Sequence, residues 1–123
     1  MIRTWFTAAL AAVALSVPAV AQDYPTKPVT LVVPFAPGGS SDVISRFVGQ
    51  KLTEMWKQSV IIDNKAGGAG QIAMQAVARS APDGYTLILG HIGTLAVNPS
   101  MFDKLSYDYK KEFLPVAMLA IVP

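Results

Sequence analysis

Gly38 and Gly39 are the residues whose type and position best suit binding chemistry. They follow the apolar, β-branched run 29–33 and precede the polar stretch 40–42, where a helix is expected to begin. The N–H groups of a helix's first turn have no partner within the helix, and the helix dipole adds partial positive charge. A carboxylate or phosphate can therefore bind there without a basic side chain. Because glycine lets a ligand approach the main chain closely, the junction predicts an anion cradle.

Polar residues follow the two glycines. Ser40 and Ser41 are predicted to cap the helix. One of their two hydroxyls is a candidate to face the ligand or a water bound to it as well. A carboxylate beside a bound anion would repel it, so Asp42 is expected to complement the helix start or hold a water. Pro37 completes the predicted binding loop. The alternative for the glycines is a tight strand-to-helix turn.

Other chemistries find little support in the sequence. A P-loop needs a Lys-Ser or Lys-Thr pair after its glycines, and none follows Gly39 or Gly70. A dinucleotide fingerprint needs a third glycine that Gly68-Ala-Gly70 lacks. One histidine and no cysteine make a metal site improbable. The absence of a G-x-S-x-G elbow likewise argues against a nucleophilic triad. No catalytic, metal or cofactor residue is predicted, and a small secreted hydrolase is the enzyme alternative.

The hydrophobic pattern supplies the strand and helix that the glycine junction needs. A continuous apolar run over 29–33 predicts a strand covered on both faces, and apolar residues at helical spacing predict a helix over 42–56. A strand over 59–63, a helix opened by the glycines of 67–70 and a strand over 85–89 follow. These elements predict an α/β fold with a parallel βαβαβ sheet.

The strand order decides which loops meet. If the first strand lies between the other two, ligands bind beyond the carboxyl ends of the strands, and loops 35–42 and 90–99 converge there. Four residues on the far side of the first strand are assigned to close packing or another structural role: Gly67, Gly68, Gly70 and Asn64.

Residues 1–21 carry the pattern of a secretory signal. Arg3 gives a positive start, 7–16 is a short apolar stretch, and Ala19-Val-Ala forms a cleavage site before Gln22. An N-terminal membrane anchor is the alternative, but the apolar stretch is shorter than the roughly 20 residues that a spanning helix needs. We therefore expect an exported protein with no direct membrane insertion after cleavage.

The mature part, residues 22–123, is close to neutral. Removal of Arg3 leaves nine of the ten basic side chains against eight acidic ones, and the charges are scattered. No nucleic-acid or membrane-surface partner is therefore indicated. The absence of cysteine excludes disulfides and a cysteine-borne lipid.

The apolar run 114–123 predicts a buried strand that nothing follows. Soluble domains seldom end on an uncovered hydrophobic edge, so we expect a truncated chain or fragment rather than one complete small domain.

Several short motifs together resemble the receptors of tripartite tricarboxylate transporters, the Bug receptor family. Their order and spacing cover essentially the whole mature chain. The motifs lie at 24–29 (YPTKPV), 33–42 (VPFAPGGSSD), 63–70 (DNKAGGAG), 81–87 (APDGYTL), Asn98-Pro99 and Tyr107-Asp108.

The resemblance implies a type II-like, two-lobed periplasmic binding protein. Such a receptor closes on a small carboxylate between its lobes, grips it with main-chain amides and ordered water, and delivers it to membrane permease subunits, without a cofactor. Family members are considerably longer, so the second lobe and the C-terminal return of the first are expected to be missing. A non-functional remnant of such a receptor is therefore the alternative.

The resemblance also brings the second loop into the predicted site. Thr94, preceded by Gly93, matches a family position that faces the cleft, and an ordinary turn residue is the alternative. His91, near the end of the third strand, is included as a candidate ligand contact. For this lone histidine we expect a partly buried, hydrogen-bonded role first.

Overall fold

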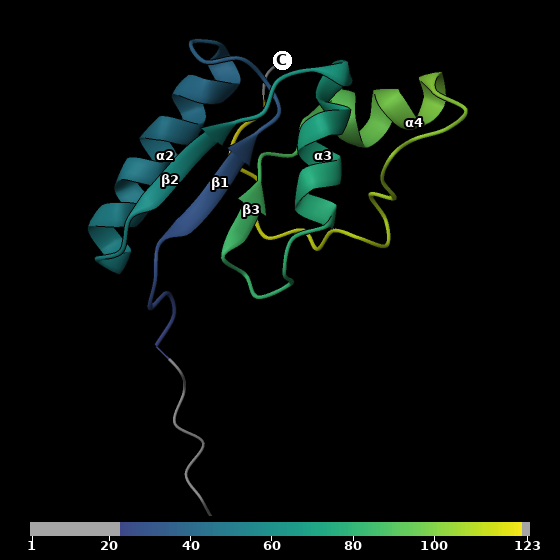
Figure 1. Cartoon of the computed structure of the whole chain (residues 1–123). Coiled ribbons are helices and arrows are strands. Elements are labelled where there is room, and N and C mark those ends of the chain that lie inside the picture. The colour runs from purple at the N-terminus through teal and green to yellow at the C-terminus, as the bar shows by residue number, and fades with distance from the viewer. Residues whose placement is uncertain (1–22, 122–123) are drawn as a thin grey trace, which may run out of the picture.

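The computed structural model of the chain describes residues 23–121, so the predicted leader and its cleavage before Gln22 lie outside the described residues. Within the described part, helices flank a three-stranded parallel sheet of order β2-β1-β3 (Figure 1). The elements in chain order are β1 (Val29–Val33), α2 (Ser40–Trp56), β2 (Val60–Asn64), the 3-10 turn η1 (Gly68–Gly70), α3 (Gln71–Ala78), β3 (Thr86–Ile88), the π-helical turn η2 (Gly93–Val97) and α4 (Asn98–Met101).

The central strand is β1, which is the condition under which loops 35–42 and 90–99 are expected to converge. Thr30 of β1 pairs with Ile61 of β2 and with Thr86 of β3. Val29 and Val33 are fully buried, which is why this strand reads as an uninterrupted apolar run. Helix α2 packs against β1 and β2, whereas α3 packs against β1 and β3. Right-handed crossovers running in opposite directions place the two helices on opposite faces of the sheet (Figure 1).

Helix α2 turns a narrow, small-residue face toward the sheet. Its buried residues are Asp42, Ser45 and Gly49. A Cβ added at Gly49 would lie 3.0 Å from Ile62 Cδ1, so the glycine permits the close approach of α2 to β2. Three larger apolar residues of the same helix are exposed, Val43, Phe47 and Met55, at 59%, 64% and 74%. The helical spacing thus predicts the helix correctly but not which of its faces is buried.

Two expectations about irregular and extended segments are wrong. The predicted loop 90–99 is largely helical, since η2 and α4 occupy most of it. The predicted buried strand over 114–123 is absent from its described part, 114–121, whose side chains are exposed, Leu114 at 91% and Ile121 at 81%. An apolar run becomes a buried strand only where a neighbouring strand and a covering face accept it, and residues 23–121 supply neither for this segment.

Candidate functional site

The loop between β1 and α2 contains two glycines with different conformations. Gly38 has a φ of 90°, a left-handed conformation that favours glycine. Gly39 is the N-cap of α2, with an extended backbone at φ −78° and ψ 169°, and it accepts the N–H of Val43 at 3.0 Å. No side chain caps the helix, so the predicted capping role of Ser40 and Ser41 is wrong. They lie one and two positions after the N-cap, as the first two helical residues.

Asp42 occupies the third helical position, and its side chain is buried. Its Oδ2 accepts the N–H of Gly38 at 2.9 Å and the Nε–H of Arg46 at 2.9 Å, while its Oδ1 accepts from Asn64 Nδ2 at 3.0 Å. The Arg46 hydrogen bond, followed by those from Gly38 and Asn64, lowers the pKa of Asp42 to about 2 against the opposing effect of burial. The carboxylate therefore complements the helix start, as predicted.

These contacts decide which main-chain amides are available. The N–H of Gly38 is directed to Asp42. The N–H groups of Gly39, Ser40 and Ser41 form no hydrogen bond with the residues that the structure describes. Because Gly39 and Ser40 are exposed, this first turn can accept an anion from solvent.

The second predicted loop does meet the first. The ring of His91 lies edge-on to Phe35, with centroids 4.9 Å apart. His91 Nδ1 accepts the N–H of Gly93 at 3.0 Å, so the histidine is hydrogen-bonded as expected, although it is exposed rather than partly buried. The convergence of loops 35–42 and 90–99 is confirmed, and each predicted residue of the second loop has a defined local partner.

Thr94 is fully buried, and its hydroxyl is engaged locally. Its Oγ1 donates to the carbonyl of His91 at 3.0 Å and accepts the N–H of His91 at 3.2 Å. The hydroxyl of Tyr107 donates to the Thr94 carbonyl. This geometry supports a turn-forming role, and direct ligand contact by Thr94 stays a prediction.

The glycine turn after β2 belongs to the same cluster of loops. A Cβ added at Gly70 would lie 2.6 Å from Thr94 Cγ2 and 3.3 Å from Pro34 Cβ, so Gly70 packs against the residues that follow β1 and β3. Asn98 Nδ2 donates to the carbonyl of Ala69 at 2.9 Å, which ties η1 to α4. The predicted close packing of Gly70 is confirmed, but its placement away from the converging loops is wrong.

Sequence reasoning missed the buried polar pair that holds this cluster together. Asn98 and Tyr107 are 3% and 5% exposed, and their side chains lie 3.3 Å apart, from Nδ2 to Oη. Both residues stand within the motifs that carry the family resemblance, which is the one signal in the sequence that points to them.

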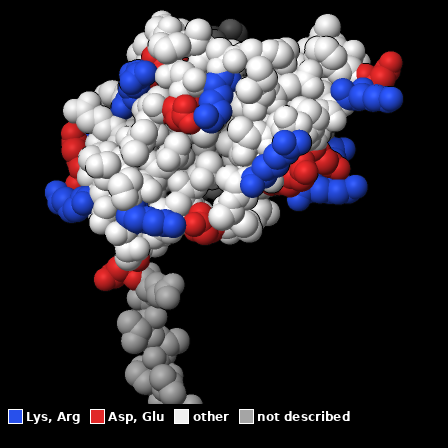
Figure 2. Space-filling model, in the orientation of Figure 1, with Lys and Arg blue, Asp and Glu red and all other residues white. Residues whose placement is uncertain are grey.

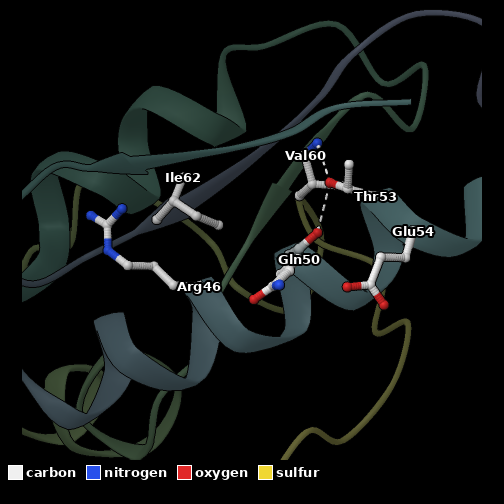
Figure 3. Close-up of a pocket in the computed structure, with 7 residues that line it drawn as sticks. Arg46, Gln50, Thr53, Glu54, Val60 and Ile62 are labelled. Carbon is white, nitrogen blue, oxygen red and sulfur yellow. Dashed lines mark hydrogen bonds between the residues drawn. The ribbon is translucent and has the colours of Figure 1, made fainter. Parts of the chain in front are cut away.

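One hollow on the described surface lies away from these loops. It is an open groove between α2 and β2 (Figure 3), lined by Arg46, Gly49, Gln50, Thr53, Glu54, Val60 and Ile62. Thr53 Oγ1 bridges the helix and the strand, donating to the Gly49 carbonyl at 2.8 Å and accepting the N–H of Val60 at 3.0 Å. The groove shares only Arg46 with the network at the helix start, so it does not lie over the candidate cradle.

The charges on the face shown in Figure 2 do not gather into a patch of one sign. Figure 2 shows Lys and Arg interspersed with Asp and Glu over the visible face. Residues 23–121 contain no group of three or more potential metal ligands. The same residues include no helix long and apolar enough to cross a membrane.

A parallel sheet whose order reverses beside its first strand, with loops gathered at its carboxyl edge, is the architecture of one lobe of a periplasmic binding protein. The sequence profile of the tripartite tricarboxylate transporter family receptors matches residues 44–123, and the chain belongs to this family.

Two curated relatives show how much of a family member the chain spans. BugT of Bordetella pertussis strain Tohama I is 38% identical over 115 residues, which cover 93% of this chain and 35% of BugT. A UPF0065 protein of Bordetella bronchiseptica is 45% identical over 111 residues, covering 89% of this chain and 33% of that protein. The chain thus spans about a third of the length of these curated relatives.

Solved structures of similar proteins carry bound carboxylates. MatC from Rhodopseudomonas palustris, solved with malate, superposes with a TM-score of 0.74 at 43% identity, covering 78% of this chain and 33% of MatC. An R. palustris protein solved with adipate gives a TM-score of 0.68 at 44% identity, covering 70% of this chain and 29% of that one. The periplasmic binding protein BugD gives 0.68 at 37% identity, over 73% and 30% of the two chains.

Proposed function

We propose that residues 22–123 form the N-terminal segment of the first lobe of a periplasmic solute receptor. The receptor binds a small carboxylate between two lobes and delivers it to the permease subunits of a tripartite tricarboxylate-type transporter. The observation that carries this proposal is the exposed first turn of α2, whose amides at Gly39, Ser40 and Ser41 have no partner among the described residues. Malate and adipate bound to two similar proteins support a carboxylate as the ligand class.

The same geometry argues against the hydrolase alternative. No hydrogen bond among the described residues joins Ser40 or Ser41 to His91, and His91 Nδ1 is occupied by the N–H of Gly93. A serine nucleophile needs a base within hydrogen-bond reach and a third group that orients this base. The similar proteins, moreover, are receptors by name. A binding role therefore accounts for the site better than catalysis.

The proposal is tested in a fusion of residues 22–123 to the part of MatC that this chain does not cover. Calorimetry compares malate with its diamide, malamide. We expect malate to bind and malamide to bind about 2 to 4 kcal/mol more weakly, because the charge that the helix start stabilises is gone. Equal binding of the two ligands would refute the anion cradle, and no binding of either would favour the non-functional remnant.

A substitution at Gly39 locates the binding event. Valine fits the extended backbone of Gly39, where an added Cβ meets nothing closer than the Ala36 carbonyl at 3.8 Å, so Gly39→Val obstructs ligand approach without straining the turn. The expected result is a loss of malate affinity comparable to that of malamide, with a smaller fall in stability, because valine is a poorer N-cap than glycine. Ala81→Val, at an exposed position outside the converging loops, is the control and should bind normally.

A further inference from the structure

Asp42 joins three separate segments at the start of α2. Its carboxylate receives the N–H of Gly38 from the loop, the Nε–H of Arg46 from the next helical turn and the side-chain amide of Asn64 from the end of β2. Asn64 also donates to the carbonyl of Phe35 at 3.1 Å and accepts from Arg46 Nη2 at 3.1 Å. Loop, helix and strand are thereby connected in one closed polar network with the buried carboxylate at its centre.

This network fixes the conformation of the loop. The hydrogen bond to Asp42 holds Gly38 at its left-handed φ and turns its N–H toward the protein. We propose that Asp42, held by Arg46 and Asn64, is the positioning residue of the carboxylate site. It sets the path of the loop and restricts the amides offered to the ligand to those of Gly39, Ser40 and Ser41. This inference rests on the proposed function.

The ion pair within the network has a second consequence. An isolated carboxylate beside the cradle would repel an anionic ligand, but Arg46 lies 2.9 Å from Asp42 and offsets its charge. The neighbouring charges on β2 and beyond, Asp63 and Lys65, pair with each other at 2.9 Å. With these charges balanced, the positive end of the α2 dipole acts on the ligand.

The test is a malate titration of the full chain, labelled with ¹⁵N, read at the amides of residues 38–41. Asp42→Asn keeps the shape of the side chain but removes its charge, and Arg46→Gln leaves that charge unbalanced. Both are expected to weaken malate binding on the order of tenfold. Arg46→Lys, which keeps the positive charge, should recover part of the loss. Asp63→Asn removes a nearby carboxylate outside the network and should stay within about twofold of the wild type.

The Gly38 amide provides a readout that does not depend on ligand. Its proton resonance should move upfield in Asp42→Asn, because a neutral amide is a weaker acceptor than a carboxylate. An unchanged Gly38 resonance, or wild-type malate affinity in both Asp42→Asn and Arg46→Gln, would overturn the inference. If Asp42→Asn fails to fold, Asn64→Ala, which removes one partner of the carboxylate, is measured in its place.

The two proposals fail in different ways. If neither the wild-type chain nor the MatC fusion binds malate, the proposed function is refuted. The comparison of the Gly38 resonance between wild type and Asp42→Asn then still decides whether Asp42 holds the loop, and an unchanged resonance rejects that role.

Discussion

Neighbouring residues of the binding loop are constrained for different reasons. Gly38 has a φ of 90° with no atom within 4 Å of an added Cβ, so its requirement for glycine is conformational. Gly39 has an ordinary extended backbone, so its conformation does not require glycine, and our proposal assigns its small size to ligand access. Asp42, rather than a serine, satisfies the loop by accepting the Gly38 N–H. The sequence presents these residues as one motif, whereas the structure gives each of them a different backbone conformation or hydrogen-bond role.

The lowered pKa of Asp42 predicts how stability responds to acid. A carboxyl group whose pKa falls to about 2 on folding stabilises the folded chain above its unfolded pKa near 4, and this contribution is lost as pH falls toward 2. Asp42→Asn should therefore be less stable than wild type at neutral pH and should lose less stability between pH 4 and pH 2. Urea unfolding over this pH range measures the difference.

A control separates Asp42 from the remaining carboxylates. Asp63→Asn alters a surface pair with Lys65 and leaves the network of Asp42 and Arg46 intact. It should keep the wild-type difference in stability between pH 4 and pH 2. If the free energy of unfolding falls equally between pH 4 and pH 2 in wild type and in Asp42→Asn, the Asp42 ion pair contributes nothing to folding.

At the scale of elements, the strands and helices that a hydrophobic pattern determines directly could be predicted from the sequence. The run 29–33 is continuous because β1 is buried on both faces. The strand order β2-β1-β3 is not determined by the sequence pattern, because right-handed crossovers fix the face on which each helix lies but not the order of the strands. The helical turns over 93–101 could not be predicted in this way, because tertiary partners hold them. Tyr107 binds the Thr94 carbonyl and Asn98 binds the carbonyl of Ala69, contacts that no local period reveals.

The contact between η1 and η2 is expected to be intolerant of even one methyl group. Gly70 has a φ of 85°, and an added Cβ would lie 2.6 Å from Thr94 Cγ2. Gly70→Ala should therefore lower the free energy of unfolding by about 2 to 4 kcal/mol, combining left-handed strain with overpacking. Equilibrium unfolding in urea measures the loss.

Matched variants divide this loss into its two causes. Gly84 has a similar φ of 80°, but its nearest contact to an added Cβ is 3.6 Å away, on Tyr24. Gly84→Ala should thus cost only the strain, about 1 kcal/mol. Thr94→Ser removes Cγ2 but keeps the hydroxyl, so it should partly rescue Gly70→Ala. Equal losses at the two glycines, or no rescue, would show that packing of Gly70 against Thr94 is not what requires the glycine.

At the scale of the whole molecule, much apolar surface lies uncovered. The segment 114–121 exposes Leu114, Val116 and Met118 at 91%, 82% and 78%, and the outer side of α2 exposes Phe47. The chain spans about a third of its curated relatives, and the charges on the described surface are too scattered to keep copies apart by repulsion. Apolar contact between copies is the physical outcome to expect from such a surface.

The chain on its own is therefore predicted to self-associate through 114–121. The triple variant Leu114→Ser, Val116→Ser and Met118→Ser should shift it toward monomer, because it removes three highly exposed apolar side chains from one continuous segment. Phe47→Ser, an equally polar change on the separate outer side of α2, is the control and should have a smaller effect. Sedimentation velocity over a range of concentrations measures association, and hydrogen exchange checks that the sheet stays protected. A wild-type chain that sediments as a compact monomer at every concentration would contradict the prediction, because the exposed segment 114–121 would then not cause association.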